Sequence, residues 1–521
     1  MPSPALISGA VVAARAPVTL RFPKPRTARH HRYPSQPPSR NVRGVSLRPR
    51  ASTVDAAQAE FSQWRTSKSI ISPNVEVAYF GDVDDEVMRY RGVKAMENIS
   101  QNDVLVELPR DSCLVLMDEA ELPFPEFCTN ALWAKLTEKN KWQVKVALNL
   151  LHEKSQGSNS EFKVYIDQLP KEFDLLSQWS SGELNELQYP AVVRAAEAQT
   201  KEDDTAFELI KKLSLDTLNK VTKTELVWAL NMVRSRVFSG RLSDNAKTKA
   251  NLLPRALAAG TAFAAFLTSQ TQEGRWLAVF AMLALVVFDG DNTDGDDDDA
   301  SNKLAYVLMP LIDAFNHRDL PQKTEFEFSS SKFRLRSPAS YNKGQEIFIS
   351  YGLLGNDELL VRYGFADPNT KNDTYVYEGL LTWLNASYEP LKKANGLSPD
   401  RLGKIRDARL ETYLKSGVFS NDSTGDSNLE WALRALLASP EEWDKAGASV
   451  DGFKLGGGAP EKKARAALSA ACAARLESMG SSIAEDEALL KSGEAKDRAR
   501  VAVEYRLGKK KILQMAVKKY S

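Results

Sequence analysis

Three runs decide the fold of this chain: Tyr306-Val-Leu-Met-Pro-Leu-Ile-Asp-Ala-Phe-Asn-His317, Glu346-Ile-Phe-Ile-Ser-Tyr351 and Asn356-Asp-Glu-Leu-Leu-Val-Arg-Tyr-Gly-Phe365. The first predicts an apolar strand that ends in an Asn-His pair. The second predicts a strand that ends in a tyrosine, just before Gly352. The third predicts a short helix that delivers Tyr363 ahead of a glycine. Because polar groups at strand ends beside glycine turns are common positions for sites on rigid scaffolds, we expect a functional site here.

The composition is that of an ordinary soluble protein, with 43% apolar and 26% charged residues in a chain of 521. This length is enough for two or more domains with large cores. The formal net charge of +1 hides an asymmetry, because residues 1–54 contain nine Arg, one Lys and no acid, which leaves the rest of the chain at −9. An acidic body argues against nucleic acid as a partner.

The three cysteines, Cys113, Cys128 and Cys472, are scattered along the chain and form no Cys-x-x-Cys pair. The sequence therefore indicates neither a disulfide framework nor a structural zinc site, and we predict no metal.

Residues 1–52 are rich in Arg, Ser, Pro and Ala and lack acids. This composition is typical of an organelle transit peptide, so we exclude the segment, which we expect to be disordered, from the fold. A mitochondrial presequence is one alternative, although its amphipathic helix is usually clearer than so much proline allows. A disordered arm that binds nucleic acid is the other alternative.

Strand and helix patterns divide the remaining chain. Residues 125–239 and the chain after Tyr377 show the periodicity of helices. Short β-rich runs separated by turn residues predict strands at 75–80, 92–96, 104–108 and 114–116.

The segment 241–303 holds two apolar runs, 256–267 and 276–288, and then the acidic run 289–299. Each apolar run is shorter than the roughly 20 residues that span a bilayer, so we expect a helical hairpin packed on the body, with contact to a membrane surface as the alternative. The acidic run predicts a solvated loop, because Ala300 cannot be the bidentate ligand of a calcium loop.

The order Asp-x-x-Asn-His, Glu-x-x-x-x-Tyr-Gly and Glu-Leu-Leu-x-x-Tyr-Gly-Phe resembles the SET-domain protein-lysine methyltransferases, especially the plastid branch typified by Rubisco large-subunit methyltransferase. Taken singly, Asn316 and His317 can cap a turn, and Tyr351 and Tyr363 can be core aromatics. Only the ordered set carries the resemblance.

The resemblance implies an α+β fold. A SET-domain β-fold would occupy residues 53–377, with a helical insert at about 125–235 and the extra segment 241–303. An all-α substrate-binding domain would follow over residues 378–521, where 497–514 resembles the last helices of the family.

The resemblance also implies a site for S-adenosyl-L-methionine. Tyr351 would be catalytic, because it would sit at the end of the lysine channel and orient the amine. The implied cofactor-binding residues are Gly92, Val93, Arg236, Asn316, His317 and Tyr351, and the implied substrate-binding residues are Ser235, Asp313 and Tyr363. Taken alone, the two arginines of Arg234-Ser-Arg236 can instead cap the C-terminal end of a helix, where cations are favoured.

The implied function is S-adenosylmethionine-dependent lysine N-methylation of a plastid stromal protein by a monomer, with Rubisco large subunit and plastid aldolase as family-level candidates. One departure keeps an alternative open: Tyr90 replaces the first glycine of the family's Gly-x-Gly turn ahead of Gly92, and tyrosine does not allow the same close backbone approach. The alternative is a weakly active or inactive SET-fold protein that serves as a protein-binding scaffold in the chloroplast. A doubly wound methyltransferase is the third hypothesis, but no Gly-rich strand-turn-helix signature supports it.

Overall fold

The computed structural model describes residues 51–80, 90–214, 218, 220–242, 304–320, 324–368, 370–393, 398–421 and 426–521. The predicted transit peptide up to residue 50, the predicted apolar hairpin and the predicted acidic loop lie outside these residues. Residues from Ser52 onward form one compact unit. Within the described ranges, no helix is both long enough and apolar enough to cross a membrane.

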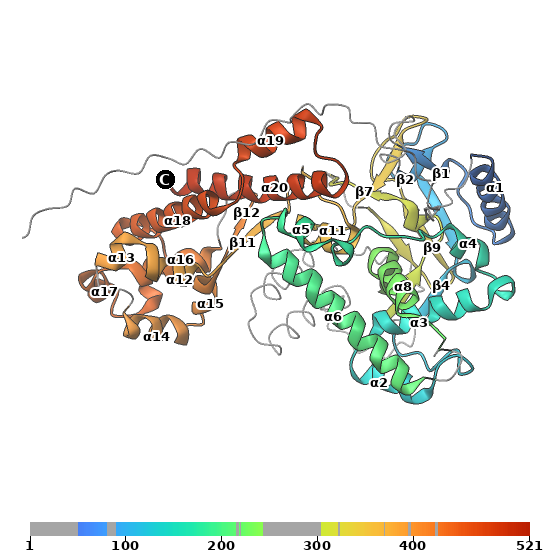
Figure 1. Cartoon of the computed structure of the whole chain (residues 1–521), viewed down its shortest axis with the longest axis horizontal. Helices are drawn as coiled ribbons and strands as arrows, with labels where there is room; N and C mark the ends of the chain where they lie inside the picture. Colours follow the sequence, from blue (N-terminus) through green and yellow to red (C-terminus); the bar gives the residue numbers. More distant parts are fainter. Residues whose placement is uncertain are drawn as a thin grey trace, which may run out of the picture. The chain divides into compact units, whose positions relative to one another are not determined.

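Three small sheets build the first half of this unit (Figure 1). The first has the order β1 (Val75–Phe80), β2 (Tyr90–Ala95), β10 (Glu346–Ile349) and β7 (Asn316–His317). The second has the order β3 (Val104–Pro109), β9 (Lys332–Arg336) and β8 (Phe326–Phe328). The third has the order β4 (Leu114–Met117), β6 (Leu304–Leu308) and β5 (Val237–Arg241).

The Asn-His pair does not end the apolar strand, as the sequence predicted. Strand β6 stops at Leu308, because Pro310 cannot donate a ladder hydrogen bond and Leu311 turns the chain with a φ of 70°. A short 3₁₀ helix, Ile312–Ala314, follows before the pair forms its own strand, β7. This turn allows β7 to join a different sheet from β6.

Strand β10 likewise stops short of the predicted end at Tyr351. It ends at Ile349, since the amide of Ser350 donates to the Thr324 hydroxyl at 2.8 Å and the amide of Tyr351 donates to His317 at 3.0 Å. Side-chain acceptors thus bind these two main-chain amides in place of a neighbouring strand, and Tyr351 lies in a loop just beyond β10.

The predicted helical insert is present and precedes β5. Its helices are α2 (Asn130–Glu138), α3 (Trp142–Ser155), α4 (Lys163–Gln168), α5 (Ser181–Asn185), α6 (Pro190–Leu213) and α8 (Lys223–Arg236). Thr222 and Glu225 form a capping box at the start of α8. The helix ends at Arg236 rather than near residue 239, because the β-branched Val237 begins strand β5.

The chain after β10 is mainly helical, as predicted, although one two-stranded sheet interrupts it. Helix α11 (Asn356–Tyr363) comes first, and β11 (Thr374–Glu378) then pairs with β12 (Ser416–Ser420). The helices around them are α12 (Leu380–Ser387), α13 (Glu389–Lys393), α14 (Pro399–Asp407), α15 (Glu411–Lys415), α16 (Ser427–Leu437), α17 (Pro440–Lys445), α18 (Gly458–Ser478), α19 (Ile483–Ser492) and α20 (Asp497–Tyr520). An N-terminal helix, α1 (Ala51–Ser67), packs on the first half.

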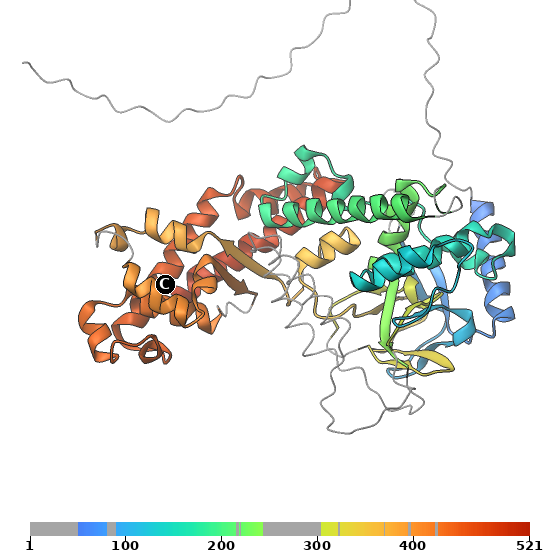
Figure 2. The same cartoon turned by 90° about the horizontal axis from the view of Figure 1, so that it is seen from below.

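Buried apolar side chains form two clusters. The first joins the three sheets to α3 and α8. The second joins the C-terminal helices to α11 and to the start of α6. Figure 2 shows most of the C-terminal helices, coloured orange to red, gathered at one side of this unit and the sheets of the first half at the other. In the sequence after β10, the division between the clusters falls between Ile349 and Leu360.

Candidate active site at the strand ends

The parallel pairing of β7 with β10 brings the Asn-His pair next to Tyr351. Phe348 stands opposite Asn316, and Ile349 stands opposite His317. The ends of parallel strands meet at one edge, so the chain leaves β10 beside the His317 ring. The Tyr351 amide donates to His317 Nδ1 at 3.0 Å, and its hydroxyl donates to the Phe315 carbonyl at 2.8 Å. Tyr351 is therefore fixed at both its main chain and its hydroxyl.

His317 is neutral and keeps one unused donor. Its side chain is fully buried, and this burial lowers the pKa of the ring. Because Nδ1 accepts a hydrogen bond, the proton of the neutral ring is on Nε2. That nitrogen lies 3.6 Å from Asp319 Oδ1 and has no hydrogen-bond partner among the described residues.

Aromatic rings pack beside the Tyr351 ring. The Tyr351 ring centroid lies 4.8 Å from that of Tyr363 and 5.1 Å from that of His317, and Phe365 lies 6.2 Å from Tyr363. Burial raises the pKa of both tyrosines, so each remains a phenol. Gly364, with a φ of 79°, ends α11 between Tyr363 and Phe365, and a Cβ there would lie 2.3 Å from the Asp174 carbonyl oxygen.

Arg236, at the end of α8, reaches the turn before β7. Its Nη1 donates to the Asp313 main-chain carbonyl and lies 3.7 Å from the Asp313 carboxylate. That carboxylate is buried and accepts from the Tyr165 hydroxyl at 2.9 Å. Arg236 Nε is also buried, and no described residue accepts its hydrogen. Arg236 therefore joins the end of α8 to the turn before β7.

The two neighbours of Arg236 on α8 use their polar groups locally. The Ser235 hydroxyl donates to the Asn231 carbonyl at 2.7 Å, so its hydrogen is not available to a substrate. Arg234 pairs with Asp203, and both side chains are buried. Of the two predicted site residues at this helix end, Ser235 can offer a substrate only its hydroxyl oxygen as an acceptor, and Arg236 keeps a buried Nε donor.

Gly92 is enclosed by polar side chains of the neighbouring strands. A Cβ at this position would lie 2.5 Å from Glu346 Oε1 and 3.0 Å from Asn316 Nδ2, so only glycine allows these groups to approach. Val93 points to the other face of β2 and is fully buried in the apolar core, which leaves only its main chain for a ligand.

Asn316 uses both hydrogens of its side-chain amide within the protein. Nδ2 donates to the Arg91 carbonyl at 2.8 Å and to Glu346 Oε1 at 2.7 Å. The group that Asn316 leaves for a ligand is therefore its Oδ1 oxygen.

The sequence analysis did not single out Glu346 or Tyr165. Glu346 begins one of the decisive strands, so its place in the motif was the available signal. Tyr165 lies 148 residues from Asp313 in the sequence, and no local pattern pairs the two.

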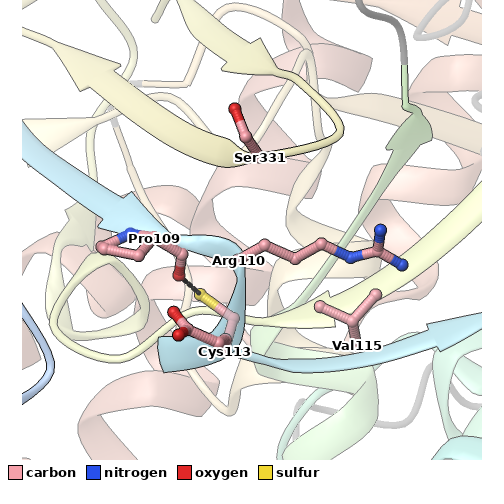
Figure 3. Close-up of a pocket in the computed structure, with 6 residues that line it drawn as sticks. Pro109, Arg110, Cys113, Val115 and Ser331 are labelled. Carbon is pink, nitrogen blue, oxygen red and sulfur yellow. Dashed lines mark hydrogen bonds between the residues drawn. The ribbon is translucent and has the colours of Figure 1, made fainter.

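A separate cavity of about 600 Å³ contains none of the predicted site residues. Pro109, Arg110, Asp111, Cys113, Val115 and Ser331 line it. Figure 3 shows the Cys113 thiol directed at the Pro109 carbonyl, and burial raises the pKa of this thiol. A buried, protonated thiol is unreactive, so Cys113 gives this cavity no nucleophile.

Two family models match the chain. The SET domain model matches residues 90–352, just over half of the chain, and the model described as Rubisco LSMT substrate-binding matches residues 411–513. The chain belongs to the SET-domain family of protein-lysine methyltransferases. Within it, the second match defines the Rubisco-methyltransferase-like type, so the family and fold class predicted from the sequence are confirmed.

Relatives extend the similarity over nearly the whole chain. A chloroplastic [fructose-bisphosphate aldolase]-lysine N-methyltransferase of Arabidopsis thaliana is 22% identical and covers 93% of this chain and 89% of its own. A chloroplastic Rubisco large-subunit N-methyltransferase of Nicotiana tabacum is 22% identical, and the match covers 95% of this chain and 88% of the relative. The crystal structure of the SET domain of LSMT bound to lysine and AdoHcy has a TM-score of 0.56 at 20% identity. The match covers 90% of this chain and 91% of that chain, and it supports the fold.

Proposed function

We propose that this protein transfers a methyl group from S-adenosylmethionine to a lysine side chain of another protein. The observation that carries the proposal is the double fixing of Tyr351 beside the Tyr363 ring: its main-chain amide donates to His317, and its hydroxyl donates to the Phe315 carbonyl. Unpaired polar atoms of the same site supply the means to hold a ligand.

The polar atoms at the strand ends fit the cofactor. Arg236 Nε and the His317 Nε2 hydrogen are buried donors without partners among the described residues, and buried donors are normally paired. They suit a carboxylate and a heterocyclic acceptor, respectively. Asn316 Oδ1 suits an ammonium group, and Gly92 allows the Asn316 and Glu346 side chains to lie close against the backbone of β2. When bound, S-adenosylmethionine supplies an electrophilic methyl group on sulfur.

The aromatic side chains prepare the substrate amine. A free lysine has a pKa of about 10.4, and only its neutral form is a nucleophile. An apolar channel walled by Tyr351, Tyr363 and Phe365 disfavours the charged form and excludes water. Because the Tyr351 hydroxyl hydrogen is donated to Phe315, its oxygen is free to accept an N–H of the amine and so direct the nitrogen lone pair. The Tyr363 ring forms a wall of the channel.

We place the substrate in the chloroplast stroma. The acid-free, Arg-rich segment 1–52 and the chloroplastic relatives support this placement. The relatives' printed substrates make Rubisco large subunit and fructose-bisphosphate aldolase the first proteins to try. We propose the division into residues 53–377 and 378–521 as two domains of one monomer.

The position of Tyr90 favours an active enzyme over a scaffold. Tyr90 as a whole is 49% exposed, its hydroxyl donates to Glu346, and Gly92 is still present next to Asn316. Calorimetric titration of the purified chain with S-adenosylmethionine tests the proposal. Saturable binding supports it, and a wild-type protein that does not bind would leave the scaffold alternative.

A further inference from the structure

A chain of hydrogen bonds begins at the residue that replaces the family's first glycine. The Tyr90 hydroxyl donates to Glu346 Oε2 at 2.8 Å, and Glu346 Oε1 accepts from Asn316 Nδ2 at 2.7 Å. The same nitrogen donates to the carbonyl of Arg91, the next residue after Tyr90, at 2.8 Å. These hydrogen bonds therefore form a closed loop around Gly92.

The tyrosine ring lies outside this loop. It stacks on Phe80 with ring centroids 6.0 Å apart, and about half of it is exposed. Gly92 supplies the space inside, because any Cβ would displace Glu346 and Asn316. Tyr90 thus reaches over a glycine that is still present.

Glu346 determines which way the Asn316 amide points. A carboxylate only accepts hydrogen bonds, and the Arg91 carbonyl only accepts them as well. The two acceptors together require Nδ2 on their side, which directs Oδ1 away from both. Without the carboxylate, one of these two constraints is lost.

We propose that Tyr90 and Glu346 are positioning residues for the methyl donor: they hold the Asn316 amide so that its Oδ1 is presented to the ammonium group of S-adenosylmethionine. This inference rests on the proposed function. Tyr90 then compensates for the missing glycine and does not abolish the site.

The charged groups near Glu346 agree with this role. Burial raises the pKa of Glu346, although the hydrogen bonds from Asn316 and Tyr90 and the charge of Arg318 oppose that rise. Burial also raises the pKa of Tyr90, to about 12, so Tyr90 remains a donor. Lys94 stands opposite Glu346 in the β2–β10 register and is a cation, like Arg318.

The experiment measures the dissociation constant for S-adenosylmethionine by calorimetry on Glu346→Gln, Tyr90→Phe and Tyr90→Gly. Glutamine has one acceptor oxygen in place of two, so we expect roughly tenfold weaker binding by Glu346→Gln, and weaker binding by both Tyr90 variants. Glu76→Gln, on neighbouring strand β1 and outside these hydrogen bonds, is the control and should bind like the wild type. Tighter binding by Tyr90→Gly would show that the tyrosine obstructs the site and would overturn the inference.

A pH series separates positioning from a general structural effect. Protonation of Glu346 removes an acceptor, so the wild-type affinity should fall as the pH is lowered from 8 to 5. His317 is present in both proteins, and burial lowers its pKa, so its protonation affects both pH curves alike. The fall should be much smaller in Glu346→Gln, and parallel pH curves for the two proteins would contradict the inference.

Failure of the inference is distinguishable from failure of the proposed function. If the wild type does not bind S-adenosylmethionine at all, the function itself is wrong. If the wild type binds and the three variants match it, only the positioning role is wrong. Thermal denaturation of each variant checks that it is folded.

Discussion

The strand-end site and the junction between α11 and α20 differ in how their buried polar groups are hydrogen-bonded. At the strand ends, Arg236 Nε and His317 Nε2 are buried without partners among the described residues. At the junction, Lys509 is fully buried, and its Nζ lies 2.6 Å from Asp357, 2.8 Å from Asp373 and 2.7 Å from the Thr374 carbonyl. Arg236 and His317 each keep an unused hydrogen-bond donor, whereas Lys509 uses its ammonium group to hold the fold together.

The junction ties the C-terminal helix to the helix that carries Tyr363. Tyr505, one turn before Lys509 on α20, also donates to Asp357 of α11. Burial alone would lower the pKa of Lys509, but the charges of Asp357 and Asp373 raise it overall. The difference from the strand ends teaches that burial of a charge does not mark a site, whereas burial without a partner is a pointer to a ligand.

Replacing Lys509 should have the largest effect on stability. Lys509→Met leaves two carboxylates buried without their cation, which should lower the free energy of unfolding by about 3–5 kcal/mol. Denaturant unfolding measures it. Lys511→Met, on the same helix, is the matched control, because the Lys511–Glu487 pair is exposed and worth at most about 1 kcal/mol. Equal losses in the two variants would show that the Lys509 cluster is not a special support.

Two arginines of α8 sharpen the comparison. Arg236→Met should weaken S-adenosylmethionine binding by about 1.5–3 kcal/mol, because hydrogen bonds to a charged group are lost. Arg234→Met should leave the affinity nearly unchanged and reduce stability, since Arg234 is paired with Asp203. Calorimetry measures the affinity of both variants, and denaturant unfolding measures their stability. Weaker binding by Arg234→Met with unchanged binding by Arg236→Met would refute the distinction between the two arginines.

The pH dependence of stability should show a small effect of His317. The folded-state pKa of His317 is lowered by burial below the ordinary value of about 6.5, so the unfolded chain binds the proton more readily. Its stabilising contribution is present above about pH 6.5 and is lost as the pH falls below that value. His317→Gln should therefore lose less stability than the wild type between pH 7 and 5. A larger loss in the variant would mean that the ring is charged when folded.

The sequence predicted the parts of the fold that repeat locally. The β-rich runs, the insert helices and the helix that delivers Tyr363 follow from periodicity and glycine positions. It did not predict that Leu311 turns the chain and separates the Asn-His pair from β6. A positive φ at leucine depends on the surrounding packing, which no local pattern expresses.

The sequence also did not predict contacts between segments that are far apart in the chain. The pairing of Tyr165 with Asp313 joins the insert to the turn before β7. The burial of Lys509 and Lys510, inside a run of three lysines, contradicts what a basic run usually means on a surface. Both depend on partners brought close only by the fold.

Labelled-methyl transfer tests the central claim most directly. Purified wild-type protein and Tyr351→Phe are incubated with labelled S-adenosylmethionine and a stromal extract. We predict that the wild type labels lysine in a protein and that the variant, lacking one hydroxyl, is slower by about 100-fold while still binding the cofactor. Equal labelling by the two proteins, or no labelling by a wild type that binds S-adenosylmethionine, would contradict the assignment of the strand ends as the methyl-transfer site.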